Sequence, residues 1–244
     1  HEEHARYSEA IEQIEDPRSA KGLVDRAIVR VVTAGTLTEE DALDAREHND
    51  LACVYACDAG AGLAWVDVST GRFAVSESPE TRIADEVARV QPAELVWPAS
   101  LPEARPALAE ELRAQLGPRI SEREDWRFDR SGALRALKRH FKVQSLEGFG
   151  LADDAPVVSA AGALIEYLEE TQRGACGHVR TIRRIESAQH LVLDRATRAC
   201  LELVRTQRDG RREGALLEAI DQTSTPMGGR LLREWLLAPL VVVE

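Results

Sequence analysis

Asp67 is the side chain of this sequence that is best placed for chemistry. It ends an apolar run of strand length and directly precedes the turn sequence Val68-Ser69-Thr70-Gly71. A carboxylate in such a position binds metal ions in nucleases, where several carboxylates converge on two ions about 3.5 to 4 Å apart. Glu94 and Asp125 are the available partners, but no pattern groups them with Asp67. Because an aspartate here serves equally well as a turn residue that binds backbone amides, we favour the structural role.

Nucleotide and metal sites lack their usual patterns in this sequence. A phosphate-binding loop needs a glycine directly before its lysine, and none of the three lysines, Lys21, Lys138 and Lys142, follows a glycine. Cys53 and Cys57 lie on one face of a predicted strand, but about 13 Å apart, which is too far to share a metal ion. We therefore expect no catalytic, cofactor-binding or metal-binding residue in this chain.

A local excess of arginine is the feature that favours nucleic-acid contacts. Residues 173–212 hold ten arginines and four acidic residues, a balance of +6 in a chain whose formal net charge is -11. Such a stretch can contact phosphates while the rest of the chain is repelled by them. Arg180, Arg183 and Arg184 are the candidate nucleic-acid-binding residues. The alternative, which we favour, is a solvated helical face with ordinary ion pairs.

The hydrophobic pattern between residues 49 and 143 alternates between strand and helix periods, which indicates an α/β domain. Asp129 is a candidate N-cap in this region, because a short acceptor side chain satisfies the first free amides of a helix. The predicted strands are 28–33, 51–57, 62–68, 72–76 and 94–97, the middle three forming a meander, and the predicted helices pass through 83–90, 108–116 and 134–141.

A break at residues 148–156 ends this pattern, and the strand signal largely disappears after it. We place a domain boundary there and expect the rest to be all helical. Helices are predicted to begin at Pro156, after Asp194 and after Thr225, where proline or a capping side chain suits the first turn. The side chains expected to face inward include Cys200 and Leu201 of one helix and Met227, Leu231, Trp235 and Leu236 of the last.

The composition bounds the class of protein. A chain of 244 residues, 44% of them hydrophobic, can bury one or two cores. No apolar run has the 18 residues that a membrane-spanning helix needs, and residues 1–4 do not resemble the start of a signal peptide. Four cysteines in a chain of this length indicate reduced thiols. We therefore expect a soluble, intracellular protein without a membrane partner.

Several short motifs, taken together, resemble the MutS family of DNA mismatch-repair proteins. They follow the family's order over nearly the whole chain, with Ala34 where the family usually has proline and Cys200 where it usually has asparagine. The matching blocks are 12–14, 16–17, 21–22, 29–36, Asp67-Val68-Ser69-Thr70-Gly71-Arg72-Phe73, 92–95, 148–150, 160–194 and Thr225-Pro226-Met227-Gly228-Gly229-Arg230-Leu231-Leu232.

The resemblance implies a division into three parts. Residues 1–47 are expected to hold the end of the mismatch-binding domain and a linker, with residues 1–10 matching nothing in the family. Residues 48–149 are expected to form an α/β ribonuclease-H-like connector domain without catalytic carboxylates. Residues 150–244 are expected to form the N-terminal part of an all-α core or lever domain, in which residues 241–244 depart from the family. The family's mismatch reader, clamp and ATPase domain are not expected in this chain.

The function that the resemblance implies is non-catalytic. Such a segment transmits conformational signals between the DNA-binding and ATPase domains, and its connector offers a docking surface to a MutL-type partner. The parent is expected to be a homodimeric, DNA-dependent ATPase of the bacterial cytoplasm, associated with the nucleoid, that uses ATP and magnesium and binds mismatched duplex DNA. Two alternatives stay open: a metal-dependent ribonuclease-H-like nuclease using Asp67, and a stand-alone DNA-binding module using the arginine stretch.

Overall fold

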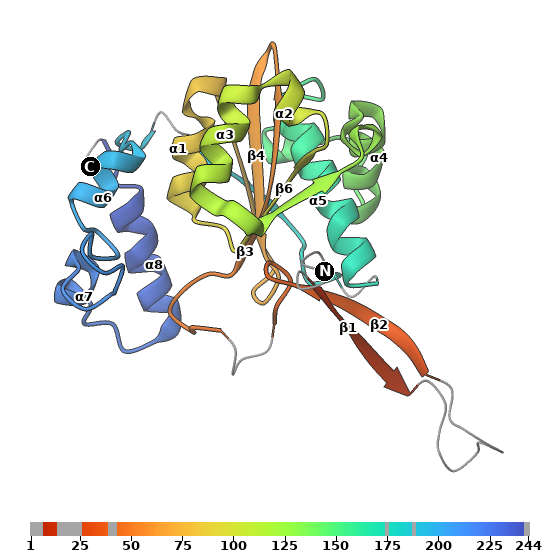
Figure 1. The fold of residues 1–244 in the computed structure, drawn as a ribbon. Helices are drawn as coiled ribbons and strands as arrows, with labels where there is room; N and C mark the ends of the chain where they lie inside the picture. Colours follow the sequence, from red (N-terminus) through yellow and green to blue (C-terminus); the bar gives the residue numbers. More distant parts are fainter. Residues whose placement is uncertain (1–6, 14–25, 39–42, 174–175, 187–188, 242–244) are drawn as a thin grey trace.

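The chain forms a projecting hairpin, an α/β body and a helical segment, in that order (Figure 1). The computed structural model describes residues 7–13, 26–38, 43–173, 176–186 and 189–241. The hairpin pairs β1 (Tyr7–Gln13) with β2 (Arg26–Thr33) in antiparallel register. We use "α/β body" for the described residues of 50–186 and "helical segment" for residues 189–241.

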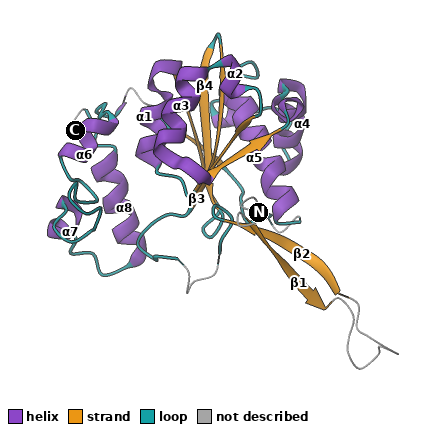
Figure 2. Ribbon diagram, viewed as in Figure 1, coloured by secondary structure: helices purple, strands orange, loops and turns teal. Residues whose placement is uncertain are grey.

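A six-stranded mixed sheet forms the centre of the α/β body (Figure 2). Its order is β7-β6-β3-β4-β5-β8. The predicted meander is confirmed, because β4 pairs antiparallel with both β3 and β5, while β6, β7 and β8 run parallel to their neighbours. The strands are β3 (Asp50–Cys57), β4 (Gly60–Asp67), β5 (Arg72–Ser78), β6 (Glu94–Pro98), β7 (Ile120–Arg123) and β8 (Ile182–Arg184).

Helices cover both faces of this sheet. Along β3, Leu51 and Cys53 belong to one buried cluster while Ala52 and Val54 belong to the other, as the period of two along a strand requires. Burial on both faces explains why these strands read as continuous apolar runs. The first face carries α4 (Arg130–Phe141) and α5 (Pro156–Thr171), and the second carries α1 (Glu80–Val90), α2 (Leu101–Ala104) and α3 (Pro106–Leu116).

Two elements that the sequence assigned to an all-helical part belong to the α/β body instead. Helix α5 is buried on nearly all sides and packs on β3, β4 and α4, because a helix that is apolar all round must be covered all round. Strand β8 extends the sheet by pairing Ile182 with Phe73. Its sequence, Ile-Arg-Arg, is too short to show an alternating pattern. The expectation that every element after residue 150 is helical is therefore wrong.

The helical segment contains α6 (Arg195–Cys200), α7 (Leu216–Ile220) and α8 (Pro226–Leu237). The predicted caps are confirmed: Asp194 accepts a hydrogen bond from Thr197 N at 2.6 Å, and Thr225 accepts one from Gly228 N at 3.1 Å. Among the described residues, no helix is both long and apolar enough to cross a membrane.

The predicted inward faces of α6 and α8 are wrong for most of their residues, although Leu236 does pack against a buried cluster. Cys200 and Leu201 are exposed, and of the α8 residues Met227 is 78% and Trp235 63% exposed, with Leu231 exposed as well. The face of α8 that is buried instead carries Gly229, Arg233 and Leu237. These positions are four residues apart and so share one side of the helix. Polar contacts to the α/β body, described below, select this side.

The contact between α4 and α5 depends on Gly162. A Cβ added there would lie 2.3 Å from Ala133 Cβ and 2.4 Å from Ala133 Cα, so the backbones of the two helices would have to separate. We expect Gly162→Ala to lower the free energy of unfolding by about 1 to 3 kcal/mol, the usual cost of overpacking. Urea denaturation followed by circular dichroism measures this change.

Gly132→Ala on α4 is the matched control. The nearest atom to its added Cβ lies 3.8 Å away, and alanine favours a helix by up to about 1 kcal/mol over glycine. This variant should therefore be neutral or more stable than the original chain. Equal effects of the two substitutions would contradict the close approach of α4 and α5.

Candidate functional site

Asp67 ends β4 and binds the turn that follows it. Its Oδ1 accepts hydrogen bonds from Ser69 N at 3.0 Å and from Ser69 Oγ at 2.6 Å, the geometry of an aspartate that starts a turn. Its Oδ2 accepts a hydrogen bond from His48 Nδ1 at 2.7 Å. Both oxygens of the buried Asp67 carboxylate therefore have partners in the chain.

His48 lies between two carboxylates that come from distant parts of the chain. Its Nδ1 contacts Asp67, while its Nε2 lies 3.1 Å from Glu234 Oε1 on α8. Burial disfavours the imidazolium, but the hydrogen bonds to Asp67 and Glu234 outweigh it and raise the pKa of His48. Burial likewise opposes the charge on Asp67, yet the bonds from His48 and Ser69 lower its pKa to about 2.

Arg72, on β5, joins the contact between His48 and Glu234 to Asp50 on β3. Its Nη2 lies 3.2 Å from Asp50 Oδ2, and its Nη1 binds Glu234. Asp50 is so deeply buried that desolvation raises its pKa in spite of the Arg72 charge, whereas Arg72 and His48 together lower the pKa of the partly exposed Glu234 against the effect of burial. We call these five residues, His48, Asp50, Asp67, Arg72 and Glu234, the junction cluster.

The loop before β3 is bound to the helical segment at further points. Arg46 Nη1 lies 2.6 Å from Asp221 Oδ2 and donates to Thr223 Oγ1 at 3.1 Å. Arg230 Nε donates to the carbonyl of Ala45 at 2.8 Å. Since this loop leads directly into β3, it joins the helical segment to the strand ends that carry the junction cluster.

The residues proposed as nuclease partners are not brought together. Glu94 accepts hydrogen bonds from Tyr167 Oη at 2.6 Å, Ser121 Oγ at 2.7 Å and Gly35 N at 3.1 Å. Asp125 accepts one from Ser100 N at 3.0 Å. Within the described part of the chain, no three His, Cys, Asp or Glu side chains are grouped so as to hold a metal ion. The nuclease hypothesis based on Asp67 is therefore not supported.

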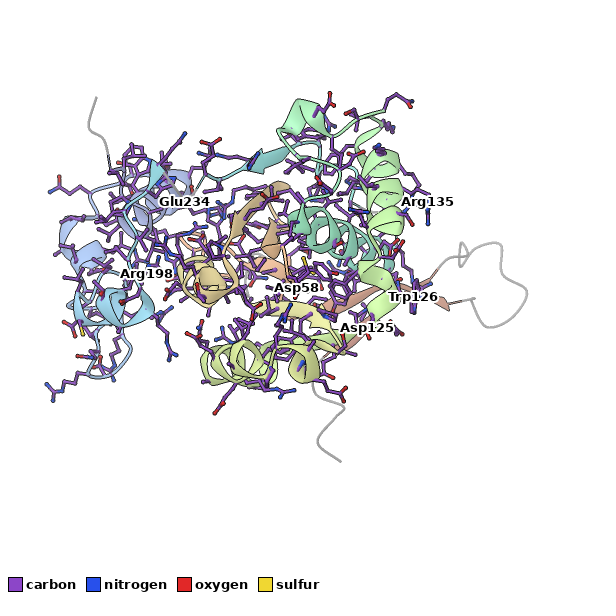
Figure 3. The ribbon with its side chains drawn as sticks, turned by 90° about the horizontal axis from the view of Figure 1, so that it is seen from above. Asp58, Asp125, Trp126, Arg135, Arg198 and Glu234 are labelled. Atoms are coloured by element: carbon purple, nitrogen blue, oxygen red, sulfur yellow. The ribbon has the colours of Figure 1, made fainter. Side chains whose placement is uncertain are left out.

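The three candidate nucleic-acid-binding arginines are exposed near one edge of the sheet. Arg183 and Arg184 lie on β8, and Arg180 precedes it. Arg184 donates to the Gly150 carbonyl at 2.5 Å and lies 3.7 Å from Glu77. Figure 3 shows Glu234 and Arg198 on one side of the molecule, with Asp125, Trp126 and Arg135 on the opposite side.

Much of the positive charge predicted for residues 173–212 is compensated from outside that stretch. Arg205 pairs with Glu47 at 3.3 Å, and Arg212 lies within 4 Å of Asp44, Glu218 and Asp221. These pairs join the helical segment to itself and to the loop before β3 rather than following a single helix face. No sequence pattern predicted these pairs, because spacing along a helix reveals only local pairs.

Comparison with known proteins connects this architecture to one family. Residues 49–180 match the family model described as MutS domain II, residues 196–244 match MutS domain III, and residues 7–41 match MutS domain I. Domain II alone thus accounts for more than half of the chain.

Curated relatives agree with the domain matches. The chain is 41% identical to the DNA mismatch repair protein MutS of Protochlamydia amoebophila, over 96% of this chain and 27% of that protein. It is 40% identical to MutS of Rhodopirellula baltica, over 94% and 28%, and 42% identical to MutS of Symbiobacterium thermophilum, over 94% and 26%. It spans about a quarter of the length of these relatives. With three domains matched in order and identity near 40%, the chain belongs to the MutS family.

Proposed function

We propose that this chain is the connector and first core segment of a MutS-type mismatch-recognition ATPase, and that it transmits conformational signals between the DNA-binding and ATPase domains. In this proposal the chain is not itself catalytic, and ATP and magnesium act in the parent's ATPase domain. The single observation that carries the proposal is the junction cluster, in which Glu234 of α8 contacts His48 in the loop before β3 and Arg72 on β5.

The α/β body is proposed to be a ribonuclease-H-like connector. The support is the run β5-β4-β3-β6-β7, in which an antiparallel meander is followed by two parallel strands, with helices on both faces. The role of Asp67 in its turn, with both oxygens engaged, agrees with a connector that has lost or never had a metal centre.

Signal transmission in this proposal is a rigid-body movement. Because Glu234 contacts both His48 and Arg72, α8 and the strand ends that carry the junction cluster move together under small perturbations. The exposed side of α8, with Met227 and Trp235, remains available to whatever moves the helix. A tilt of α8 then reaches β4 through His48 and β5 through Arg72.

The partners in this proposal are those of the family. The connector offers a docking surface to a MutL-type protein, the parent acts as a homodimer on mismatched duplex DNA, and it works in the bacterial cytoplasm at the nucleoid. Within this chain, the hairpin and the exposed arginines around β8 are the parts proposed to contact DNA. Division at 47/48 and 149/150 stays a prediction, although α5 packs on the sheet across the second boundary.

Coupling between α8 and the sheet is tested by hydrogen exchange of the chain with Glu234→Gln. A neutral amide weakens the contacts of residue 234 with both His48 and Arg72. We expect the α8 amides to exchange about tenfold faster, a change of about 1.4 kcal/mol, while amides of β4 keep their rates. Glu111→Gln, on the exposed side of α3, is the matched control. Equal protection of α8 in both variants would refute the coupling.

The raised pKa of His48 predicts a pH dependence of the helical segment. A group whose pKa is higher in the folded chain stabilises it below its unfolded pKa, about 6.5 for histidine, and loses this effect as pH rises through the folded pKa. The charged groups that face His48 are Asp67, Glu234, Arg72 and Asp50. We expect the free energy of unfolding to fall as the pH rises above about 6.5 and through the raised pKa of His48.

The Asp67 carboxylate gives a pH dependence of the opposite sign, because it lowers the free energy of unfolding as the pH falls. The pKa of Asp67 is about 2 in the fold, so its contribution is present above its unfolded value, about 3.9, and is lost as pH falls toward 2. Urea titrations at several pH values measure both limbs. His48→Gln should flatten the limb above pH 6, whereas His178→Gln, which affects a bond to the Val68 carbonyl, should leave it in place. An unchanged limb in His48→Gln would exclude His48 as its source.

DNA binding by this chain alone is expected to be weak and without mismatch preference. If three or four arginines contact phosphates, the logarithm of affinity falls with the logarithm of salt at a slope of about -3 to -4. Reversing the charge at Arg183 and Arg184 should reduce the slope by about 2, while Arg135→Glu, at an exposed position on α4, should not. Fluorescence anisotropy with matched and G·T duplexes decides this. A mismatch preference above about tenfold would show that this segment reads DNA itself.

A further inference from the structure

A basic cavity lies where the helical segment meets α1 and α3. Its volume is about 560 Å³, within the size range of small-molecule sites. Five arginines line it, and Glu47 is the one carboxylate among its described lining residues. Figure 3 shows Arg198, one of the five, on the side of the helical segment that faces the α/β body. The arginines are Arg119, Arg195, Arg198, Arg205 and Arg233.

Two of these arginines, the buried Arg233 and the half-buried Arg198, have no carboxylate hydrogen-bond partner among the described residues. Arg233, only 9% exposed, donates to Gln91 Oε1, and Arg198 donates to the Asp85 carbonyl at 2.7 Å. The Nε atom of each is buried and has no hydrogen-bond partner among the described residues. Neither guanidinium has an ion pair within that part of the chain. Both therefore hold a full positive charge on neutral acceptors alone.

No acidic group forms an ion pair with these two arginines among the described residues: Asp85, Glu86 and Asp194 act on Arg198, and Glu47 and Asp50 on Arg233, only through their charge. Glu47 binds Arg205 at the cavity wall, at 3.3 Å, and is thereby already engaged. Burial lowers the pKa of Arg198 and of Arg233, whereas Arg105 and Arg127, which have carboxylate partners, have raised values. A buried cation without a counter-charge is unfavourable unless a ligand supplies one.

We propose that this cavity binds a small phosphate-bearing molecule, with its oxyanion held by Arg198 and Arg233. A guanidinium presents planar, paired donors that suit phosphate oxygens, and the two free Nε–H groups supply donors that the chain itself leaves unused. Val87, Leu116 and Val204, also in the lining, provide apolar contact for the rest of such a ligand. The site differs from a phosphate-binding loop, since it uses side chains rather than backbone amides.

Isothermal titration of the full chain with inorganic phosphate, at constant ionic strength, tests the site. We expect one binding event with a Kd of about 1 mM or tighter. Arg198→Gln and Arg233→Gln should each weaken it by at least about tenfold, and Arg135→Gln, an exposed arginine on α4, should leave it within about twofold. Phosphate binding that is absent up to about 20 mM, or equal in all variants, would overturn the proposal.

Thermal unfolding in phosphate-free buffer separates a ligand site from a purely structural role. Because Arg233→Gln removes a buried charge that has no ion pair among the described residues, the variant should unfold at the same temperature as the original chain or higher. A large decrease would mean that the guanidinium supports the fold, and would count against the proposal. A titration with a 20-base-pair duplex distinguishes the two classes of ligand. If Arg198 and Arg233 bind the duplex but not phosphate, the ligand of this site is DNA and the proposal of a small molecule is wrong.

Discussion

The imidazole of His48 lies between two carboxylates, Asp67 and Glu234, that belong to different parts of the chain. Taking these charges out of water is costly, and only their mutual arrangement offsets the cost. The turn after β4 holds Asp67 in place, and the length of α8 places Glu234 opposite it. The junction cluster therefore fixes one orientation of the helical segment against the sheet. The loop before β3, which is bound to the helical segment and leads into the sheet, is held in the same arrangement.

The α/β body supplies the rigid support that such a junction needs. Its strands are buried on both faces, and Gly162 allows α5 to approach α4 so closely that no side chain fits between them. Close-packed interiors resist deformation, so strain at the sheet edge is passed on rather than absorbed. In the helical segment the buried cluster is small, and Met227, Leu231 and Trp235 are exposed. The buried core of the α/β body thus provides stability, whereas the junction cluster sets the orientation of the helical segment.

Local signals in the sequence predicted most of the elements but not their assembly. Asp129, Asp194 and Thr225 were found as caps because capping involves neighbours only three residues away. Strands β7 and β8 were missed because short edge strands carry little pattern. Asp67 was recognised as a turn residue, but its contact with His48 was missed because the two residues are 19 positions apart. The contact between Arg72 and Glu234, 162 positions apart, was missed for the same reason. Arg198 and Arg233 carried no signal at all, because burial without a counter-charge is a property of the assembled junction.

The orientation of α8 shows why hydrophobic period alone misplaced this helix. The apolar residues Met227, Leu231 and Trp235 would form a good core stripe, yet the side that meets the α/β body carries Gly229, Arg233 and Glu234. A contact built on apolar area tolerates sliding, because the hydrophobic effect has no direction. Ion pairs with fixed geometry do not tolerate it. Under the proposed signalling role, a segment that reports the position of distant domains is better joined through ion pairs, which leave its apolar side free for other parts of the protein.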